Sequence, residues 1–161
     1  MQKLTPIQSI KTVDTNVQTA QVTVNKSAEI NFAEETVQKF WLIISLVMQQ
    51  LPLLTPTLSE TFKGFRREAI DATSVVSAII REQFFERAAI LNRVQVNHLI
   101  SLINTYIFIL ESEALREKLS DVLSLHCGIT TKEPSSITHE IIEMKLLKLE
   151  LREWLIEGVQ F

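Results

Sequence analysis

The stretch from Leu58 to Ser124 reads LSETFKGFRREAIDATSVVSAIIREQFFERAAILNRVQVNHLISLINTYIFILESEALREKLSDVLS. It contains no proline and no glycine after Gly64, and its apolar residues recur at helical spacing. A single helix of this length would measure about 100 Å, whereas a domain of this size is about 30–35 Å across. The stretch therefore predicts two antiparallel helices. Length and charge place the turn between them near residues 81–94.

The first half of this stretch predicts a narrow helical seam. Its apolar residues follow a 3-4-3-4-3 spacing, which is typical of a helix that packs along one line. These residues are Phe62, Phe65, Ala69, Ala72, Val76 and Ile79. The second half, from Val94, is apolar on nearly every side, so we expect it to be buried among other helices. We expect a kink at Ser112 and a glycine cap at Gly128.

An earlier helix is expected to begin near residue 31. Asn31 and Glu34 have the spacing of a capping box, in which each side chain accepts a backbone N–H of the first turn. The residues that follow are apolar on most sides. Pro52 is expected to end this helix, and Pro52–Thr57 is expected to form a loop.

The last helix is expected from Ser136 or Thr138 to Glu157, with Gly158 as its cap. The chain has only three glycines and four prolines, fewer than the turns of an all-β or α/β fold need. The sequence therefore predicts an all-α fold, an antiparallel up-down four-helix bundle with room for a fifth short helix.

Residues 1–30 differ from the rest because they are polar and lack a helical period. Ala20, Val22 and Val24 alternate with polar residues, which indicates a short strand. Two interpretations stay open: a partly extended arm, or a strand that pairs with a partner or a neighbouring subunit. We expect two parts, an N-terminal arm over 1–30 and a helical domain over 31–161.

The apolar segments are too short for a membrane protein. The longest block, Phe40–Met48, is interrupted by Ser45, whereas a membrane span needs about 20 apolar residues. The N-terminus shows no signal-peptide pattern, and Cys127 is the only cysteine. We therefore expect a cytoplasmic protein without a membrane partner.

No pattern of catalytic residues is found. The sequence lacks nucleotide-binding glycine motifs, and its three histidines lack the Glu-x-x-His spacing of a di-metal bundle. His126 and Cys127 are adjacent, but neighbours on a helix do not face each other, so they do not suggest a nucleophile and its base. We expect no enzyme activity, no cofactor and no metal.

Basic residues collect in the second predicted helix and the turn after it. They are Lys63, Arg66, Arg67, Arg81, Arg87 and Arg93. Clusters of this kind contact phosphates, which makes them candidate nucleic-acid-binding residues. The alternative is a solvated face paired with nearby glutamates, and a net charge of −3 argues against a large nonspecific nucleic-acid surface.

The apolar surface of the helices exceeds what a single four-helix bundle buries, and such an excess marks interfaces. We therefore expect a homo-oligomer or a protein partner. Candidate interface residues are Phe40, Trp41, Ile44, Phe84, Phe85, Tyr106 and Phe108.

The helix order resembles a family of small four-helix-bundle proteins encoded in bacterial 23S ribosomal RNA intervening sequences. Relatives of that family include the accessory variability protein of diversity-generating retroelements. The matching segments are Leu51-Pro52, Phe65-Arg66-Arg67-Glu68-Ala69-Ile70, Gly128-Ile129-Thr130 and Leu151-Arg152-Glu153-Trp154-Leu155-Ile156. The resemblance covers residues 32–157. It implies a non-catalytic, ring-forming bundle that binds a reverse transcriptase and structured RNA.

The sequence thus favours a non-catalytic accessory subunit that docks a protein partner and binds RNA or DNA, similar to a reverse-transcriptase accessory protein. An alternative is a small helical subunit of a CRISPR-type nucleoprotein effector complex. In that case the basic residues from Lys63 to Arg93 would line a nucleic-acid groove and contact a single strand.

Overall fold

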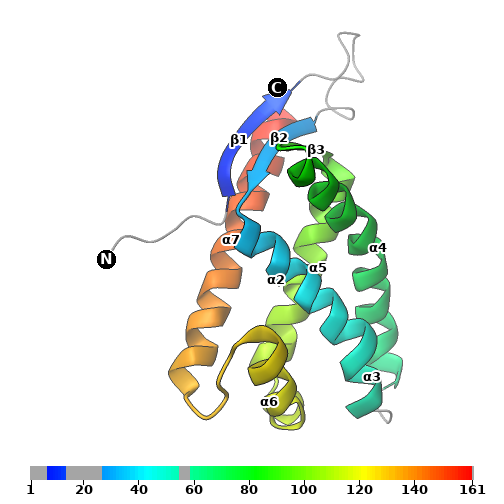
Figure 1. Ribbon diagram of the computed structural model, residues 1–161, viewed down its shortest axis with the longest axis vertical. Coiled ribbons are helices and arrows are strands. Elements are labelled where there is room, and N and C mark those ends of the chain that lie inside the picture. Colours follow the sequence, from blue (N-terminus) through cyan, green and yellow to red (C-terminus); the bar gives the residue numbers. More distant parts are fainter. Residues whose placement is uncertain (1–6, 14–26, 55–58, 161) are drawn as a thin grey trace.

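The computed structural model of the protein describes residues 7–13, 27–54 and 59–160 (Figure 1). The described chain is mostly helical, as predicted, but it also contains a small sheet. The elements are β1 (Ile7–Val13), β2 (Ser27–Phe32), α2 (Glu34–Ser45), the π-helical segment η2 (Leu46–Gln50), α3 (Leu51–Leu54), α4 (Ser59–Phe84), β3 (Ala89–Asn92), α5 (Arg93–Glu111), α6 (Glu113–Cys127) and α7 (Pro134–Gln160).

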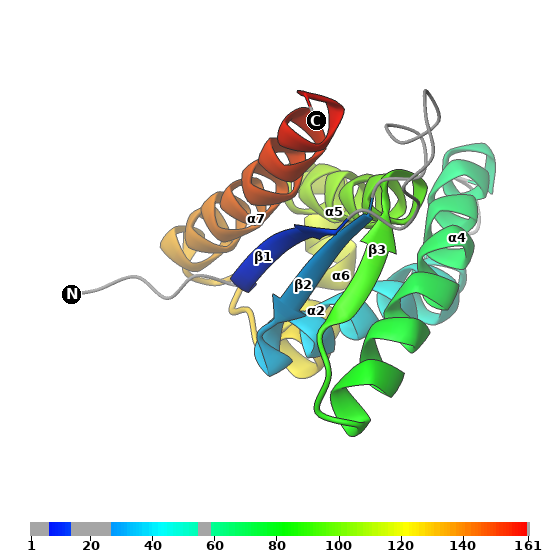
Figure 2. The same ribbon diagram turned by 90° about the horizontal axis from the view of Figure 1, so that it is seen from above.

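The sheet is antiparallel with the strand order β1-β2-β3, so the N-terminal segment pairs within its own chain. Its inner face is apolar: Ile30 lies opposite Ala89 and Ala28 opposite Leu91, and all four side chains are buried. One end of the helices carries this sheet, with α7 beside β1 and α4 beside β3 (Figures 1 and 2). The predicted up-down four-helix bundle is therefore not confirmed.

Two strands, β1 and β2, lie wholly or partly within the predicted arm over residues 1–30. An extended segment is present, but its boundary at residue 30 falls inside β2. The expected strand at Ala20, Val22 and Val24 lies outside the described residues. The strand signal that mattered was the alternation of Ala28, Ile30 and Phe32, which are buried in β2.

The stretch from Leu58 to Ser124 divides into separate helices, as its length predicts. α4 ends at Phe84, and α5 begins at Arg93, so the predicted turn near residues 81–94 is confirmed. The intervening residues also contribute β3, which was not predicted. The seam of α4 is buried at Ala69, Ala72, Val76 and Ile79. α5 lies among α2, α4, α6 and α7, which explains its nearly continuous apolar surface.

The earlier helix begins and ends later than predicted. Asn31 lies in β2 rather than at a helix cap, and α2 begins at Glu34. The helical path then continues past Pro52 to Leu54 instead of stopping there. The reason lies in η2, where Leu51 N–H bonds to the carbonyl of Leu46, five residues back. A widened turn just before a proline gives room to the ring that would otherwise press on the preceding turn.

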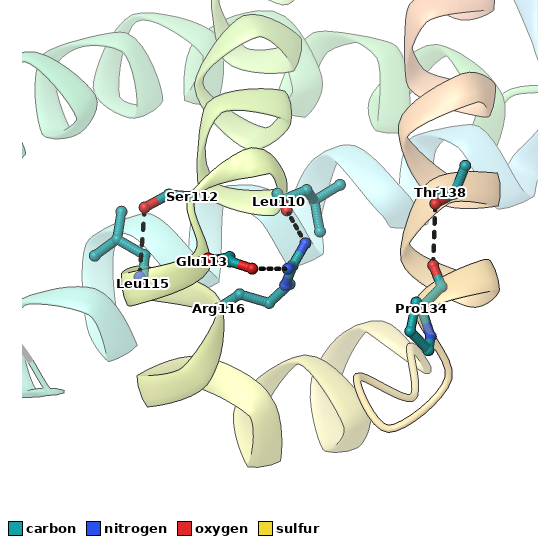
Figure 3. Close-up of polar contacts among 7 residues, drawn as sticks. All are labelled: Leu110, Ser112, Glu113, Leu115, Arg116, Pro134 and Thr138. Carbon is teal, nitrogen blue, oxygen red and sulfur yellow. Dashed lines mark hydrogen bonds and ion pairs between the residues drawn. The ribbon is translucent and has the colours of Figure 1, made fainter.

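The kink at Ser112 and the cap at Gly128 are confirmed. Ser112 Oγ accepts a hydrogen bond from Leu115 N–H (3.4 Å) at the start of α6 (Figure 3). The Arg116 guanidinium reaches back and donates to the carbonyl of Leu110 (3.0 Å) near the end of α5. Gly128 closes α6 in the left-handed conformation with a φ of 68°, which glycine adopts at little cost.

The bounds of the last helix differ from the prediction. α7 begins at Pro134, a residue that suits the first turn of a helix because it needs no N–H partner there. Thr138 Oγ1 donates to the carbonyl of Pro134 (3.0 Å), as Figure 3 shows. The helix also runs through Gly158 to Gln160, so Gly158 is not its cap.

Candidate functional site

The C-terminal end of α4 is capped by two backbone hydrogen bonds, which define the turn after it. Arg87 N–H bonds to the carbonyl of Glu82 (2.8 Å) and Glu86 N–H to that of Gln83 (2.9 Å), which is the bonding pattern of a Schellman motif. The residue that turns the chain is Glu86, with a φ of 56°. Glycine usually holds this position, because other residues are strained there. A glutamate in its place is the reason that no glycine or proline marked the turn in the sequence.

This turn presents two phenylalanines to solvent. Phe84 is 81% exposed and Phe85 is 56% exposed, and their rings meet edge to face with centroids 5.2 Å apart. The Arg87 guanidinium lies over the Phe85 ring at 5.0 Å and forms a salt bridge with Glu82 (3.0 Å). We call Phe84, Phe85 and Arg87 the aromatic corner. Phenylalanine and arginine side chains held in this way are typical of the centres of protein interfaces.

An open pocket of about 600 Å³ lies beside the aromatic corner. It runs between the last turns of α4 and the strand β3. Its lining residues are Glu29, Asn31, Ala78, Arg81, Glu82, Glu86, Arg87, Ala88, Ala89, Ile90, Leu91 and Gln95. Three glutamates and two arginines give the lining a formal charge of −1, so the pocket is not a phosphate site by charge.

The predicted basic residues do not form one patch. All six are exposed, but Lys63, Arg66 and Arg67 lie in the second turn of α4. Arg81 lies 14 residues beyond Arg67, a distance of about 21 Å along the helix. Of the six, the pocket brings together only Arg81 and Arg87.

The predicted interface residues divide into two groups. Phe40, Ile44 and Tyr106 are buried in the core, so these three do not offer surface to a partner. Their burial depends on the sheet and on the helices that cover them, which the local sequence pattern does not show. The exposed ones are Trp41 on α2, Phe84 and Phe85 at the aromatic corner and Phe108 on α5, whose ring packs on that of Phe65 at 5.5 Å between centroids.

Sequence reasoning missed the exposed Ile90. Its alternation with the buried Ala89 and Leu91 was a two-residue period that could have identified β3. It also missed Asn92 and Gln95, whose side chains form a capping box at the start of α5. That spacing could have fixed the beginning of this helix.

A second polar cluster is partly buried between helices. Lys39 Nζ contacts Glu140 Oε2 at 2.7 Å, and Tyr106 Oη donates to the same oxygen at 2.9 Å. Burial, together with the charge of Glu140, raises the pKa of Tyr106 far above its usual value. Burial also raises the pKa of Cys127, and the positive charge of Lys39 partly offsets this increase. A buried thiol with a raised pKa is a poor nucleophile. The contacts of Lys39 and Tyr106 with Glu140 join α2, α5 and α7.

Within residues 7–13, 27–54 and 59–160, no group of three or more histidine, cysteine or acidic side chains is arranged to hold a metal ion. The same ranges contain no helix with the length and hydropathy of a membrane span. Comparison of the chain with protein-family models, with curated proteins and with solved structures found no match. The candidate site therefore rests on the aromatic corner and its pocket.

Proposed function

We propose that this protein is a non-catalytic binding subunit that docks a protein partner through the aromatic corner. The observation that carries the proposal is the exposure of Phe84 and Phe85 on adjacent positions of a closed turn. Soluble proteins rarely display neighbouring large apolar side chains without a use for them. The left-handed Glu86 in the same turn is a strained position, and strain of this kind collects at functional sites.

The energetics favour this corner as an anchor. Burying a phenylalanine side chain contributes roughly 1.5–3 kcal/mol, and two adjacent rings can enter the same partner pocket. The closed turn and the Arg87 contacts hold these side chains before binding, so less entropy is lost when a partner docks. The family resemblance suggests a reverse transcriptase as the partner, and the alternative interpretation of the sequence suggests a subunit of an effector complex.

The proposal is tested by capturing partners of the tagged protein from cells and comparing two variants. Phe84→Ser/Phe85→Ser should lose at least about tenfold of the partner, because two apolar anchors are removed. Leu125→Ser is the matched control, since Leu125 on α6 is as exposed as Phe84. Equal recovery of the partner by both variants would contradict the proposal.

A second candidate function is nucleic-acid binding at the other end of α4. Lys63, Arg66 and Arg67 are exposed at i, i+3 and i+4, which places them on neighbouring positions of one helical turn. Such a group suits phosphate contacts. Binding of single-stranded RNA should then weaken with salt and fall in Arg66→Glu/Arg67→Glu, while Arg152→Glu on α7 serves as the charge control. An unchanged affinity in the double variant would exclude this surface.

A further inference from the structure

The strand β3 lies at an edge of the sheet, and the direction of its backbone groups can be worked out. In an antiparallel pair, hydrogen-bonded and non-hydrogen-bonded residue pairs alternate. Asn92 lies opposite Ser27, but its N–H donates to the side chain of Gln95 (2.9 Å) instead. The pair Ser27–Asn92 is therefore not hydrogen-bonded, and neither is the pair two residues along, Glu29–Ile90.

A contact at the other end of β2 indicates the same direction for the backbone groups of β3. Gln83 Nε2 donates to the carbonyl of Phe32 (2.9 Å), so this carbonyl points toward α4 and the β3 side. Phe32 is two residues from Ile30, which pairs with Ala89, and alternate residues of a strand point the same way. Ala89 and Leu91 thus bond to β2. The N–H and C=O of Ile90 point away from β2, to the outer edge.

The pocket lies between α4 and β3 and extends to Glu29 and Asn31 of β2. Ala78, Arg81 and Glu82 of α4 line one side of it, and residues 88–91 line the other. Neighbouring strands lie about 4.8 Å apart, so an added strand would occupy the pocket between β3 and α4. The flanking α4 blocks the edge-to-edge approach of a whole second sheet, which argues against a second copy of β3 as the occupant.

We propose that β3 accepts an extended peptide segment of a partner protein as an added strand, with an apolar side chain beside Ile90 and a basic side chain directed to Glu29. Addition of this kind uses the backbone groups that an edge strand leaves unpaired. The Ile90 side chain is half exposed on the outer face, opposite Glu29. It offers an apolar contact next to an acidic one.

The charge of the pocket selects the peptide. Glu82 and Arg87 form a salt bridge and neutralise each other. The other charged lining residues are Glu29, Glu86 and Arg81, which together carry a formal charge of −1. A segment that carries a basic residue two positions from its apolar residue, and therefore on the same face, complements this surface better than an acidic one. The inference rests on the proposed function in one respect, because it takes the partner to be a protein.

The direct test uses two fluorescent ten-residue peptides with serine at every second position; the positions between carry valine and lysine in turn in one peptide and valine and glutamate in turn in the other, so that both side chains lie on one face of the strand. The valine–lysine peptide should bind at least about tenfold more tightly, since two acidic groups face it and only one basic group opposes it. Amide hydrogen exchange should show Ile90 N–H exchanging freely in the unbound protein and protected in the complex. Binding without protection of Ile90 would overturn the inference.

A pair of variants isolates the backbone contribution. Ile90→Pro removes the outward N–H but breaks no hydrogen bond to β2. Proline is tolerated in an edge strand at a position whose N–H points outward. The substitution should weaken binding of the valine–lysine peptide at least about tenfold, since the ring also stands where the partner carbonyl would lie. Ile90→Val keeps the N–H and should bind within about threefold of the original. Equal binding by both variants would refute strand addition.

The two proposals can fail separately. If the captured cellular partner is lost in Phe84→Ser/Phe85→Ser but retained in Ile90→Pro, the aromatic corner docks the partner and strand addition is wrong. If Ile90→Pro does not fold, hydrogen exchange at Ile90 in the unaltered protein still decides the question. If neither site affects the partner, both proposals are wrong.

Discussion

At the scale of single residues, Glu86 shows how one backbone conformation organises a surface. Its φ of 56° closes α4 and directs the chain into β3, and the aromatic corner lies on either side of it. A left-handed conformation costs a residue with a Cβ atom roughly 1–2 kcal/mol relative to glycine. The protein tolerates this cost because two backbone hydrogen bonds and the Glu82–Arg87 salt bridge hold the turn.

Replacing this residue should therefore stabilise the fold. Glu86→Gly is expected to raise the free energy of unfolding by about 1 kcal/mol, because glycine adopts this conformation without strain. Chemical denaturation measures the change. Glu86→Ala is the control, since alanine removes the charge but keeps the Cβ atom. If the alanine variant gains as much stability as the glycine variant, backbone strain at this position is not the cause.

Tyr106 makes stability depend on pH in the alkaline range. Its pKa is raised above the usual value by burial, so the folded state keeps the proton that the unfolded state loses above about pH 10. The stability contributed by the neutral hydroxyl is complete below that pH and is lost as pH rises beyond it.

The free energy of unfolding should thus fall more steeply above pH 10 in the unaltered protein than in Tyr106→Phe. Tyr106 is the only tyrosine, so tyrosinate absorbance reports its ionisation alone. The absorbance should appear together with unfolding. Ionisation in the folded state near the usual pKa of about 10 would contradict the burial of this hydroxyl.

At the scale of elements, caps decide where α5 begins. The Asn92 side chain accepts from Gln95 N–H (2.9 Å), and the Gln95 side chain accepts from Asn92 N–H (2.9 Å). Asn92→Ala should lower the free energy of unfolding by about 1 kcal/mol, while Asn92→Asp should keep most of it. Thermal or urea unfolding measures both. A loss of the same size in the aspartate variant would show that capping is not the cause.

The two capping-box patterns show which parts of the fold could be predicted from the sequence. Asn31 with Glu34 and Asn92 with Gln95 have the same spacing, but only the second caps a helix. Asn31 lies instead in β2, whose partner β3 is far away in the sequence. A local sequence pattern does not predict a pairing between strands so far apart in the chain. Helices governed by local periodicity, such as α4 and α5, could be predicted, whereas the pairing of distant strands into a sheet could not.

The candidate site could be predicted only in part, for a similar reason. The exposed aromatic pair at Phe84 and Phe85 was recognisable, because two aromatic residues stood among charged ones. The burial of Phe40 and Tyr106 was not, because it depends on which helices cover them. The direction of the Ile90 backbone groups follows from the ladder register, which no local pattern fixes.

At the scale of the whole molecule, much of the apolar surface that suggested an oligomer is buried within one chain, around α5. Exposed apolar residues remain on several elements, among them Trp41, Leu53 and Phe108. The homo-oligomer stays a prediction. Light scattering at micromolar concentration should give a mass that is a multiple of 18.4 kDa. A mass of one chain would contradict it.

The order of the strands also has a consequence for folding during synthesis. β2 is the central strand, yet its partner β3 is made about 60 residues later, which takes roughly 3–12 s at the rate of a ribosome. Until then one edge of β2 has no native partner. The sheet is therefore completed only after α4 has been synthesised, and β1 and β2 wait through that interval for the strand that completes it.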